Sequence, residues 1–199
     1  MIITVASFKG GVGKTTSAVH LAACLNRQAP TMLLDGDVNA NALAWAEAGR
    51  LPFPVFDVEA APDDAGERFT HTVFDTGGGL KPDELGTLAA GCDLLVIPAS
   101  PGTLDTHTLT RTLGVLRELP QASYRVLLTR VPPPPRTDGA QLRAALAGLG
   151  IPLFAAEVPA LVAYEKAAAS GQIAAEVDDR NARRAWAAYE AVSNEVLHG

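Results

Sequence analysis

The sequence predicts one α/β domain over residues 1–199, with a mostly parallel central sheet and helices on both of its faces. Short apolar runs bounded by turn residues recur along the chain, as is typical of strands buried on both faces. Stretches with helical spacing lie between them, and this alternation favours a parallel sheet with crossover helices. With 48% hydrophobic and 19% charged residues in 199, the chain is long enough for one well-buried core.

The predicted elements follow in order. Strands are expected, six or seven in all, at 2–6, 31–34, 72–74, 94–97, 125–128 and, more weakly, 153–156. Helical spacing occurs at 18–25, 109–116 and 142–149. A final helix is expected to begin near Asp178 and Asp179, whose carboxylates suit a helix N-terminus. Its buried face would carry Ala182, Ala185, Trp186, Tyr189, Val192 and Val196.

Composition narrows the class of protein further. The net charge of -6 leaves any affinity for nucleic acid to a local basic patch. Cys24 and Cys92 stand far apart in apolar stretches, which indicates small buried side chains in a reducing compartment. No basic segment precedes the apolar N-terminus, and Lys9 interrupts it, so neither a signal peptide nor a membrane span is expected. The expected location is the cytoplasm.

A glycine-rich loop follows the first predicted strand and leads directly into a helical pattern. It consists of Lys9, Gly10, Gly11, Val12, Gly13, Lys14, Thr15 and Thr16. Such glycines let backbone N–H groups curl around phosphate oxygens, and the helix N-terminus adds a positive dipole end. Lys14 would reach the β- and γ-phosphates and the Thr15 hydroxyl would coordinate Mg²⁺. The alternative is a plain glycine turn.

The loop departs from the usual phosphate-loop pattern in one way. Phe8 stands where that pattern has glycine, and a second lysine, Lys9, opens the loop. This resembles the deviant Walker A box of the ParA/MinD family of ATPases. The resemblance implies a single-domain P-loop NTPase fold that binds ATP and Mg²⁺, and a Lys9 that crosses a dimer interface to contact the partner's phosphates. The alternative for Lys9 is a solvated side chain.

Two carboxylates close the second predicted strand. By resemblance, Asp35 helps to hold the hydration shell of Mg²⁺, and Asp37 orients or polarises the attacking water. Either one singly has a plainer alternative, which is to cap the helix that follows. Many family members continue with Asp-Pro-Gln-x-Asn, whereas this chain matches that pattern only at Asn41, so the role of this loop in dimer contacts is left open.

The strand predicted at 72–74 ends in Asp75, which is the Walker B arrangement for a water-mediated hold on Mg²⁺. Glycines at 77–79 follow, where a loop that senses the γ-phosphate would gain conformational freedom; a plain turn is equally compatible. Further along, 92–98 with Pro101, Leu104 and Asp105 resembles the fourth-strand segment of short ParA proteins. By position in the family, Thr129, Arg130 and the region of Pro159 would lie near the nucleotide base.

Arginines near the start of the final helix form a candidate DNA-binding surface. Arg180, Arg183 and Arg184 fall at helical spacing, and an extension would use Lys166, Arg143 or Arg136. The alternative is an ordinary solvated helix face. The last ten residues carry no Lys or Arg, so membrane attachment through a basic helix is not expected. Trp45 and Trp186 are expected in the core or at a dimer surface.

The resemblance implies a ParA-like ATPase that dimerises with ATP and Mg²⁺, binds nucleoid DNA nonspecifically and positions plasmid, chromosome or other cargo. A ParB-like or other adaptor would stimulate hydrolysis. One alternative is a metabolic or transport P-loop ATPase acting on a small molecule, which would be stimulated by its acceptor without DNA. Another is a nucleotide-regulated interaction module that releases no phosphate.

Overall fold

The computed structural model describes residues 1–7, 9–80, 82–102, 114 and 124–199. Seven strands form one sheet in the order β3-β2-β4-β1-β5-β6-β7, and every neighbouring pair is parallel. This confirms the predicted α/β class. The strands are β1 Ile2–Val5, β2 Thr31–Gly36, β3 Val55–Asp57, β4 His71–Thr76, β5 Leu94–Ala99, β6 Tyr124–Val131 and β7 Leu153–Pro159.

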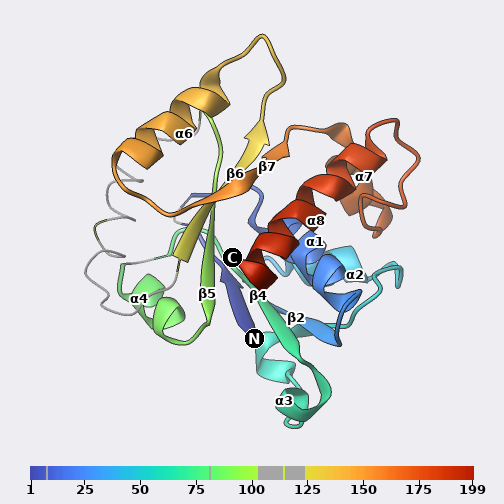
Figure 1. Cartoon of the computed structure of the whole chain (residues 1–199). Helices are drawn as coiled ribbons and strands as arrows, with labels where there is room; N and C mark the ends of the chain where they lie inside the picture. Colours follow the sequence, from blue (N-terminus) through green and yellow to red (C-terminus); the bar gives the residue numbers. More distant parts are fainter. Residues whose placement is uncertain (8, 81, 103–113, 115–123) are drawn as a thin grey trace.

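Helices cover both faces of the sheet, as predicted (Figure 1). One face carries α1 Lys14–Asn26, α2 Asn41–Ala46, α7 Val162–Ser170 and α8 Ala182–His198, and the other carries α4 Pro82–Ala90 and α6 Asp138–Gly148. The short elements η1 Val58–Ala60 and α3 Ala65–Arg68 join β3 to β4. Apart from residue 114, the helix predicted at 109–116 lies outside the described residues, as do Leu104 and Asp105.

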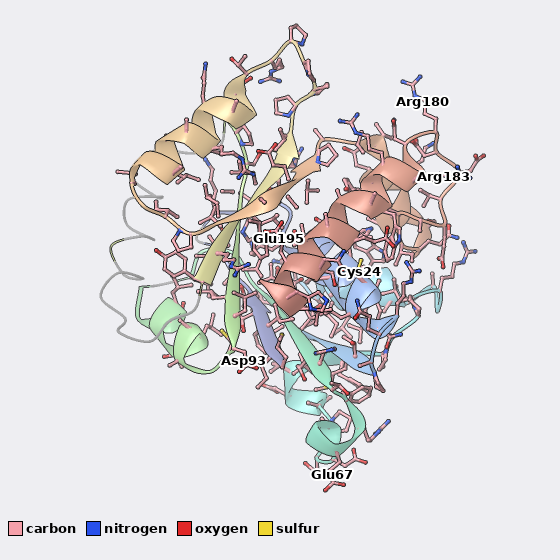
Figure 2. All side chains as sticks on the ribbon, viewed as in Figure 1. Cys24, Glu67, Asp93, Arg180, Arg183 and Glu195 are labelled. Carbon is pink, nitrogen blue, oxygen red and sulfur yellow. The ribbon has the colours of Figure 1, made fainter. Side chains whose placement is uncertain are left out.

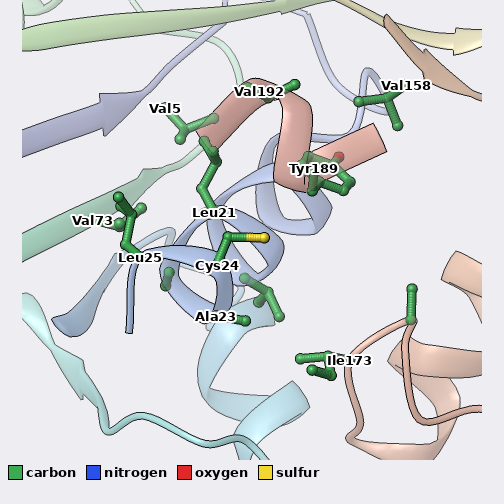
Figure 3. Close-up of a cluster of buried hydrophobic side chains, with 14 of the residues drawn as sticks. Val5, Leu21, Ala23, Cys24, Leu25, Val73, Val158, Ile173, Tyr189 and Val192 are labelled. Atoms are coloured by element: carbon green, nitrogen blue, oxygen red, sulfur yellow. The ribbon is translucent and has the colours of Figure 1, made fainter. Parts of the chain in front are cut away.

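The larger core is built around α1, whose residues 17–25 are all buried. Figure 3 shows Leu21 of this helix lying between Val73 of β4 and Tyr189 of α8. Because α1 has the sheet on one side and α8 on the other, it is buried all round instead of along one stripe. Each fully buried leucine of this kind stabilises the fold by about 2 kcal/mol. The helix that begins at the glycine-rich loop is therefore held rigidly.

His20 links α1 to the segment between α7 and α8. Its Nδ1 donates to the carbonyl oxygen of Thr16 at 2.7 Å, and its Nε2 accepts the backbone N–H of Ala174 at 3.0 Å. Burial lowers the pKa of His20 to about 4, so the ring is neutral at pH 7 and this tautomer satisfies both nitrogens. The sequence pattern gave no sign of this role.

Three details differ from the sequence-based expectations or refine them. β3 was missed, because it is a run of only three residues that comes directly after prolines at 52 and 54. The final helix begins at Ala182 rather than near Asp178, and Asp179 instead accepts the backbone N–H of Asn181 just before the helix. Trp45 and Trp186 are 6% and 9% exposed, so both belong to the core.

The edge strand β7 is covered by side chains from two helices. Between Leu153 and Glu157 it bulges against β6, which frees backbone groups from the sheet ladder. Glu195 of α8 accepts the N–H groups of Ala155 and Ala156 at 2.8 and 2.7 Å. Arg143 of α6 donates to the carbonyl oxygens of residues 154 and 155, and its Nε pairs with Glu157. These side chains satisfy backbone groups of residues 154–156 that the sheet ladder does not.

Within the part of the chain that the structure describes, no helix is both long enough and apolar enough to span a bilayer. Cys24 and Cys92 are both free thiols, and Cys24 is buried.

Candidate nucleotide-binding site

The glycine-rich loop lies at the carboxyl end of β1, a central strand between β4 and β5. From β1 the chain runs through α1 to β2 on one side, whereas β4 continues through α4 to β5 on the other. Connections that diverge in this way leave a crevice at the carboxyl edge of a parallel sheet, and ligands of open α/β folds bind there. The loop therefore lies at the position where open α/β folds bind their ligands.

Two left-handed glycines shape the loop. Gly11 has φ 74° and Gly13 has φ 87°, and Gly13 is the N-cap of α1. Residues with a Cβ adopt such angles only with strain, so glycine is required at both positions. The loop thus curls before the free N–H groups at the start of α1, a geometry that binds anions through backbone donors and the helix dipole.

Lys14 lies at the first position of α1 and is only 8% exposed. A glycine loop lies against it, since a Cβ added at Gly78 would stand 3.7 Å from Lys14 Nζ and 3.9 Å from Gly10 Cα. Lys9, at the entrance of the loop, is half-buried, and its backbone N–H donates to Ser7 Oγ at 3.3 Å. The two predicted lysines and the glycines that follow Asp75 are therefore brought to one place.

Asp75, at the end of β4, is fully buried. Neither carboxylate oxygen has a hydrogen bond of ordinary geometry from any described residue. Burial raises the pKa of Asp75 to about 7; the Thr15 hydroxyl and Lys14 oppose the rise, and the nearby Asp35 and Asp37 add to it. A buried carboxylate without a partner fits a hydrated divalent cation beside it, because oxygen ligands and negative charge are what Mg²⁺ prefers.

Asp35, at the end of β2, is equally buried but fully satisfied. Its Oδ1 accepts the backbone N–H of Asp37 at 3.0 Å, and its Oδ2 accepts those of Ala42 and Leu43 at 2.9 and 3.0 Å. These last two N–H groups are orphan donors in the first turn of α2. The geometry favours the capping alternative for Asp35, and its predicted contribution to the hydration shell of Mg²⁺ stays a prediction.

Asp37 is held ready at the rim of the site. Its Oδ1 accepts the backbone and side-chain N–H groups of Asn39, and its Oδ2 accepts the side chain of Asn41. Partial burial acts to raise its pKa, but these hydrogen bonds, with the charge of Lys14, hold the pKa of Asp37 below its ordinary value. The carboxylate therefore stays ionised at pH 7. The two asparagines, two and four residues beyond Asp37, are the local signal that the sequence interpretation did not use.

A cavity of about 320 Å³ opens beside the glycine-rich loop. Its walls include Gly13 and Thr16 from the loop and Thr129, Arg130 and Pro159 from the ends of β6 and β7. The structure thus brings these three predicted residues to the same cavity as the loop. Val158 belongs to the region expected beside Pro159. Sequence reasoning missed the other walls, which are Ala160, Leu161, Val162, Tyr164, Glu165, Ala168 and Tyr189.

A family model described as the CobQ/CobB/MinD/ParA nucleotide binding domain matches residues 3–174. The chain belongs to this family. Among curated relatives, "Maintenance of carboxysome distribution protein A" of Gloeobacter kilaueensis is 34% identical and the match covers 98% of this chain and 93% of that protein. "Protein ParA" of Rhizobium radiobacter is 30% identical over 66% of this chain and 65% of its own length.

Solved structures agree on the fold of this MinD/ParA-type domain. Apo McdA from Cyanothece matches with a TM-score of 0.76 at 19% identity, over 96% of this chain and 98% of that one. MinD from Pyrococcus horikoshii, solved with Mg-ADP, matches with a TM-score of 0.70 at 19% identity, over 99% and 96%. At such identities the likeness establishes the fold, and the residues of this chain must carry any argument on chemistry.

The predicted basic surface of this MinD/ParA-type chain lies at the N-terminal end of α8. Arg180, Arg183 and Arg184 are all exposed, and Figure 2 shows the first two projecting away from the body of the protein. None of the three forms an ion pair with another described residue. The predicted extension is weaker, because three basic residues there already have acidic partners: Lys166 with Asp179, Arg143 with Glu157 and Arg136 with Asp138.

Proposed function

We propose that this protein is an ATPase that binds ATP with Mg²⁺ at the glycine-rich loop and hydrolyses it to ADP and phosphate. The observation that carries the proposal is the pairing of an anion-binding loop with Asp75, a buried carboxylate that receives no hydrogen bond of ordinary geometry from the described residues and suits a hydrated cation. Membership of a nucleotide-binding family supports it.

The residues of the chain would divide the work of phosphoryl transfer. The loop from Gly10 to Thr16 holds the phosphates, Lys14 neutralises their charge, and Asp75 and the Thr15 hydroxyl hold the cation through water or directly. Bound Mg²⁺ supplies further neutralisation of charge on the transferred group. Asp37, kept ionised by Asn39 and Asn41, accepts a hydrogen bond from the attacking water and orients it.

The finer proposal is a nucleotide-switched positioning protein. With ATP two copies form a dimer in which Lys9 of each contacts the other's phosphates, and the dimer binds DNA without sequence preference through Arg180, Arg183 and Arg184. A partner protein stimulates hydrolysis and ends the bound state. Two of the relatives are named for carboxysome distribution and for ParA, which supports a role in distributing a cargo. We expect the active protein in the cytoplasm at the nucleoid.

Phosphate release and nucleotide binding test the first proposal. Lys14→Ala should lose ATP binding, whereas Lys9→Ala should keep it and lose dimerisation and turnover. Intact ATP binding in Lys14→Ala would overturn the assignment of the loop, and normal turnover in Lys9→Ala would remove the role of Lys9 in the dimer.

Fluorescence anisotropy with a random-sequence DNA duplex tests the proposed nucleotide-switched binding of DNA. Binding should be tighter with Mg-ATP than with Mg-ADP and should fall with salt by about 0.9 log unit per log unit of salt for each phosphate contacted. The double variant Arg183→Ala, Arg184→Ala should weaken it, with Arg68→Ala as the control because Arg68 is also exposed but lies on α3. Absence of binding in both nucleotide states would leave an ATPase that acts on something other than DNA.

A further inference from the structure

Two consecutive side chains near the end of β6 form hydrogen bonds with the glycine-rich loop. Thr129 Oγ1 donates to the carbonyl oxygen of Val12 at 2.7 Å, and Arg130 Nη1 donates to the carbonyl oxygen of Gly11 at 3.0 Å. The partners are 117 and 119 residues apart in sequence. Two adjacent carbonyl groups of the loop are therefore fixed from the same strand end.

Fixing a carbonyl also fixes the N–H of the next residue. In a trans peptide the C=O of one residue and the N–H of its successor point in opposite directions. Carbonyl groups of Gly11 and Val12 that turn toward β6 thus direct the N–H groups of Val12 and Gly13 to the opposite side of the loop. Left-handed glycines on both sides of Val12 supply the backbone curvature that makes successive N–H groups converge on an anion.

We infer that Thr129 and Arg130 are positioning residues that hold the loop in its phosphate-binding shape, and that they act on the phosphate-bearing part of the ligand instead of the base. This inference rests on the proposed function. It assigns their polar atoms a different task from the base contact that family position suggested, although both residues also line the cavity beside the loop.

Backbone strain and burial at the strand end support this role. Arg130 has φ 50°, a left-handed conformation that an arginine adopts at a cost, and such strain persists where surrounding contacts demand it. Thr129 is 1% exposed, and its hydroxyl also lies 3.3 Å from the carbonyl oxygen of Ala99. The left-handed turn at Arg130 allows two neighbouring residues of one strand to reach the same loop.

The charge of Arg130 also favours an anion. A carbonyl oxygen near a phosphate would repel it, whereas the guanidinium draws the Gly11 carbonyl aside and places a positive charge beside the loop. The arginine thus acts through the loop, without having to contact the nucleotide.

Equilibrium binding to the full chain tests the inference with three probes: Mg-ATP, Mg-GTP and Mg-tripolyphosphate, the last having no base. Thr129→Val removes the hydroxyl at nearly constant volume, and Arg130→Leu removes the guanidinium. Each should weaken all three probes by the same factor, about five- to tenfold, as expected for the loss of one net hydrogen bond. Thr129→Ser and Arg130→Lys should recover part of the affinity. Arg136→Leu is the control, since its guanidinium pairs with Asp138 and not with the loop.

The outcomes separate the inference from the proposed function. Unchanged affinities in both Thr129→Val and Arg130→Leu would overturn the inference and show that these side chains have no role in binding. Weaker binding of ATP, with tripolyphosphate binding unaffected and the ratio of ATP to GTP affinity altered, would overturn it in favour of a base contact. If wild-type protein binds none of the probes, the proposed function fails first. Should Thr129→Val fail to fold, the exposed Arg130 still permits the test, because its removal leaves the core intact.

Discussion

The ends of β2 and β4 place two buried aspartates side by side, Asp35 and Asp75 being register partners, yet their surroundings are opposite. Asp35 accepts three backbone N–H groups and stabilises the first turn of α2. Asp75 has no such donor among the described residues, and its pKa is raised to about 7. A carboxylate satisfied by the backbone serves the fold, whereas one left unsatisfied at a cost in stability is a candidate for contact with a ligand.

The largest expected effect is on stability as a function of pH. The pKa of Asp75 is raised from 3.8 to about 7, so between these values the native state keeps a proton that the unfolded state has lost. The contribution of Asp75 to stability therefore falls as pH rises through this window, by up to about 4 kcal/mol, whereas the contribution of buried His20, whose pKa is lowered to about 4, rises with pH up to about 6.5. Urea unfolding of nucleotide-free protein with chelator, from pH 4.5 to 8, should show the stability of wild type falling relative to that of Asp75→Asn, in which the opposite slope from His20 remains. Parallel curves for the two proteins would contradict the prediction.

The next effect is on the proposed turnover. Asp75→Asn removes the charge that holds the cation and should slow phosphate release by about a hundredfold, in line with the several kcal/mol that a bound metal contributes. The same variant should be more stable than wild type at pH 8 without nucleotide, since it no longer buries an unpaired charge. Wild-type turnover in this variant would show that another group holds the cation.

Removing the other carboxylate should mainly affect folding. Asp35→Ala leaves the buried N–H of Ala42 and its neighbour in α2 without an acceptor, so it should lower the free energy of unfolding by about 2 kcal/mol. Denaturant unfolding at pH 7 measures this, with Asp57→Ala as the control because Asp57 caps only the short exposed η1 through Glu59. An equal loss of stability in both variants would mean that Asp35 has no special place in the core.

The smallest expected effect concerns the glycine between the two strand ends. A Cβ at Gly36 would approach the Phe74 ring to 3.0 Å, so Gly36→Ala should displace that ring at a cost of about 1 kcal/mol. Gly66→Ala is a suitable control, since a Cβ there meets nothing within 4 Å. Thermal unfolding compares the two; if Gly36→Ala is as stable as the control, the ends of β2 and β4 are looser than the contact distances imply.

Much of the fold and the glycine-rich loop could be predicted because their signals are local. The glycine-rich loop is a contiguous pattern, in which a strand is followed by Gly11, Gly13 and Lys14 and then by a helix. Strands buried on both faces are visible in the sequence as apolar runs. The place of Asp75 at the end of a buried strand could be predicted for the same reason, because it follows such a run. The short β3 gave no comparable signal, because its three residues owe their strand conformation to pairing with β2.

The different surroundings of the two buried aspartates could not be predicted from the sequence. An aspartate at the end of a strand caps a helix only if the fold brings free N–H groups to it. Asp35 and Asp75 have almost the same local sequence context, so this difference between them is not visible in the sequence. The bonds from Thr129 and Arg130 to the glycine-rich loop join residues more than a hundred positions apart. The hydrogen bonds from Asn39 and Asn41 to Asp37 join residues two and four positions apart, so they could have been predicted from the spacing.

The side chains that cover β7 also limit how copies of this chain can associate. A strand edge with free N–H and C=O groups is a template for a strand from another molecule, and sheets joined in this way grow into fibres. Here Glu195 and Arg143 already bind four backbone groups at residues 154–156, so a strand pairing there would first have to break charged hydrogen bonds. At these residues the edge resists extension of the sheet by a second copy, so any association of copies would have to use other surfaces.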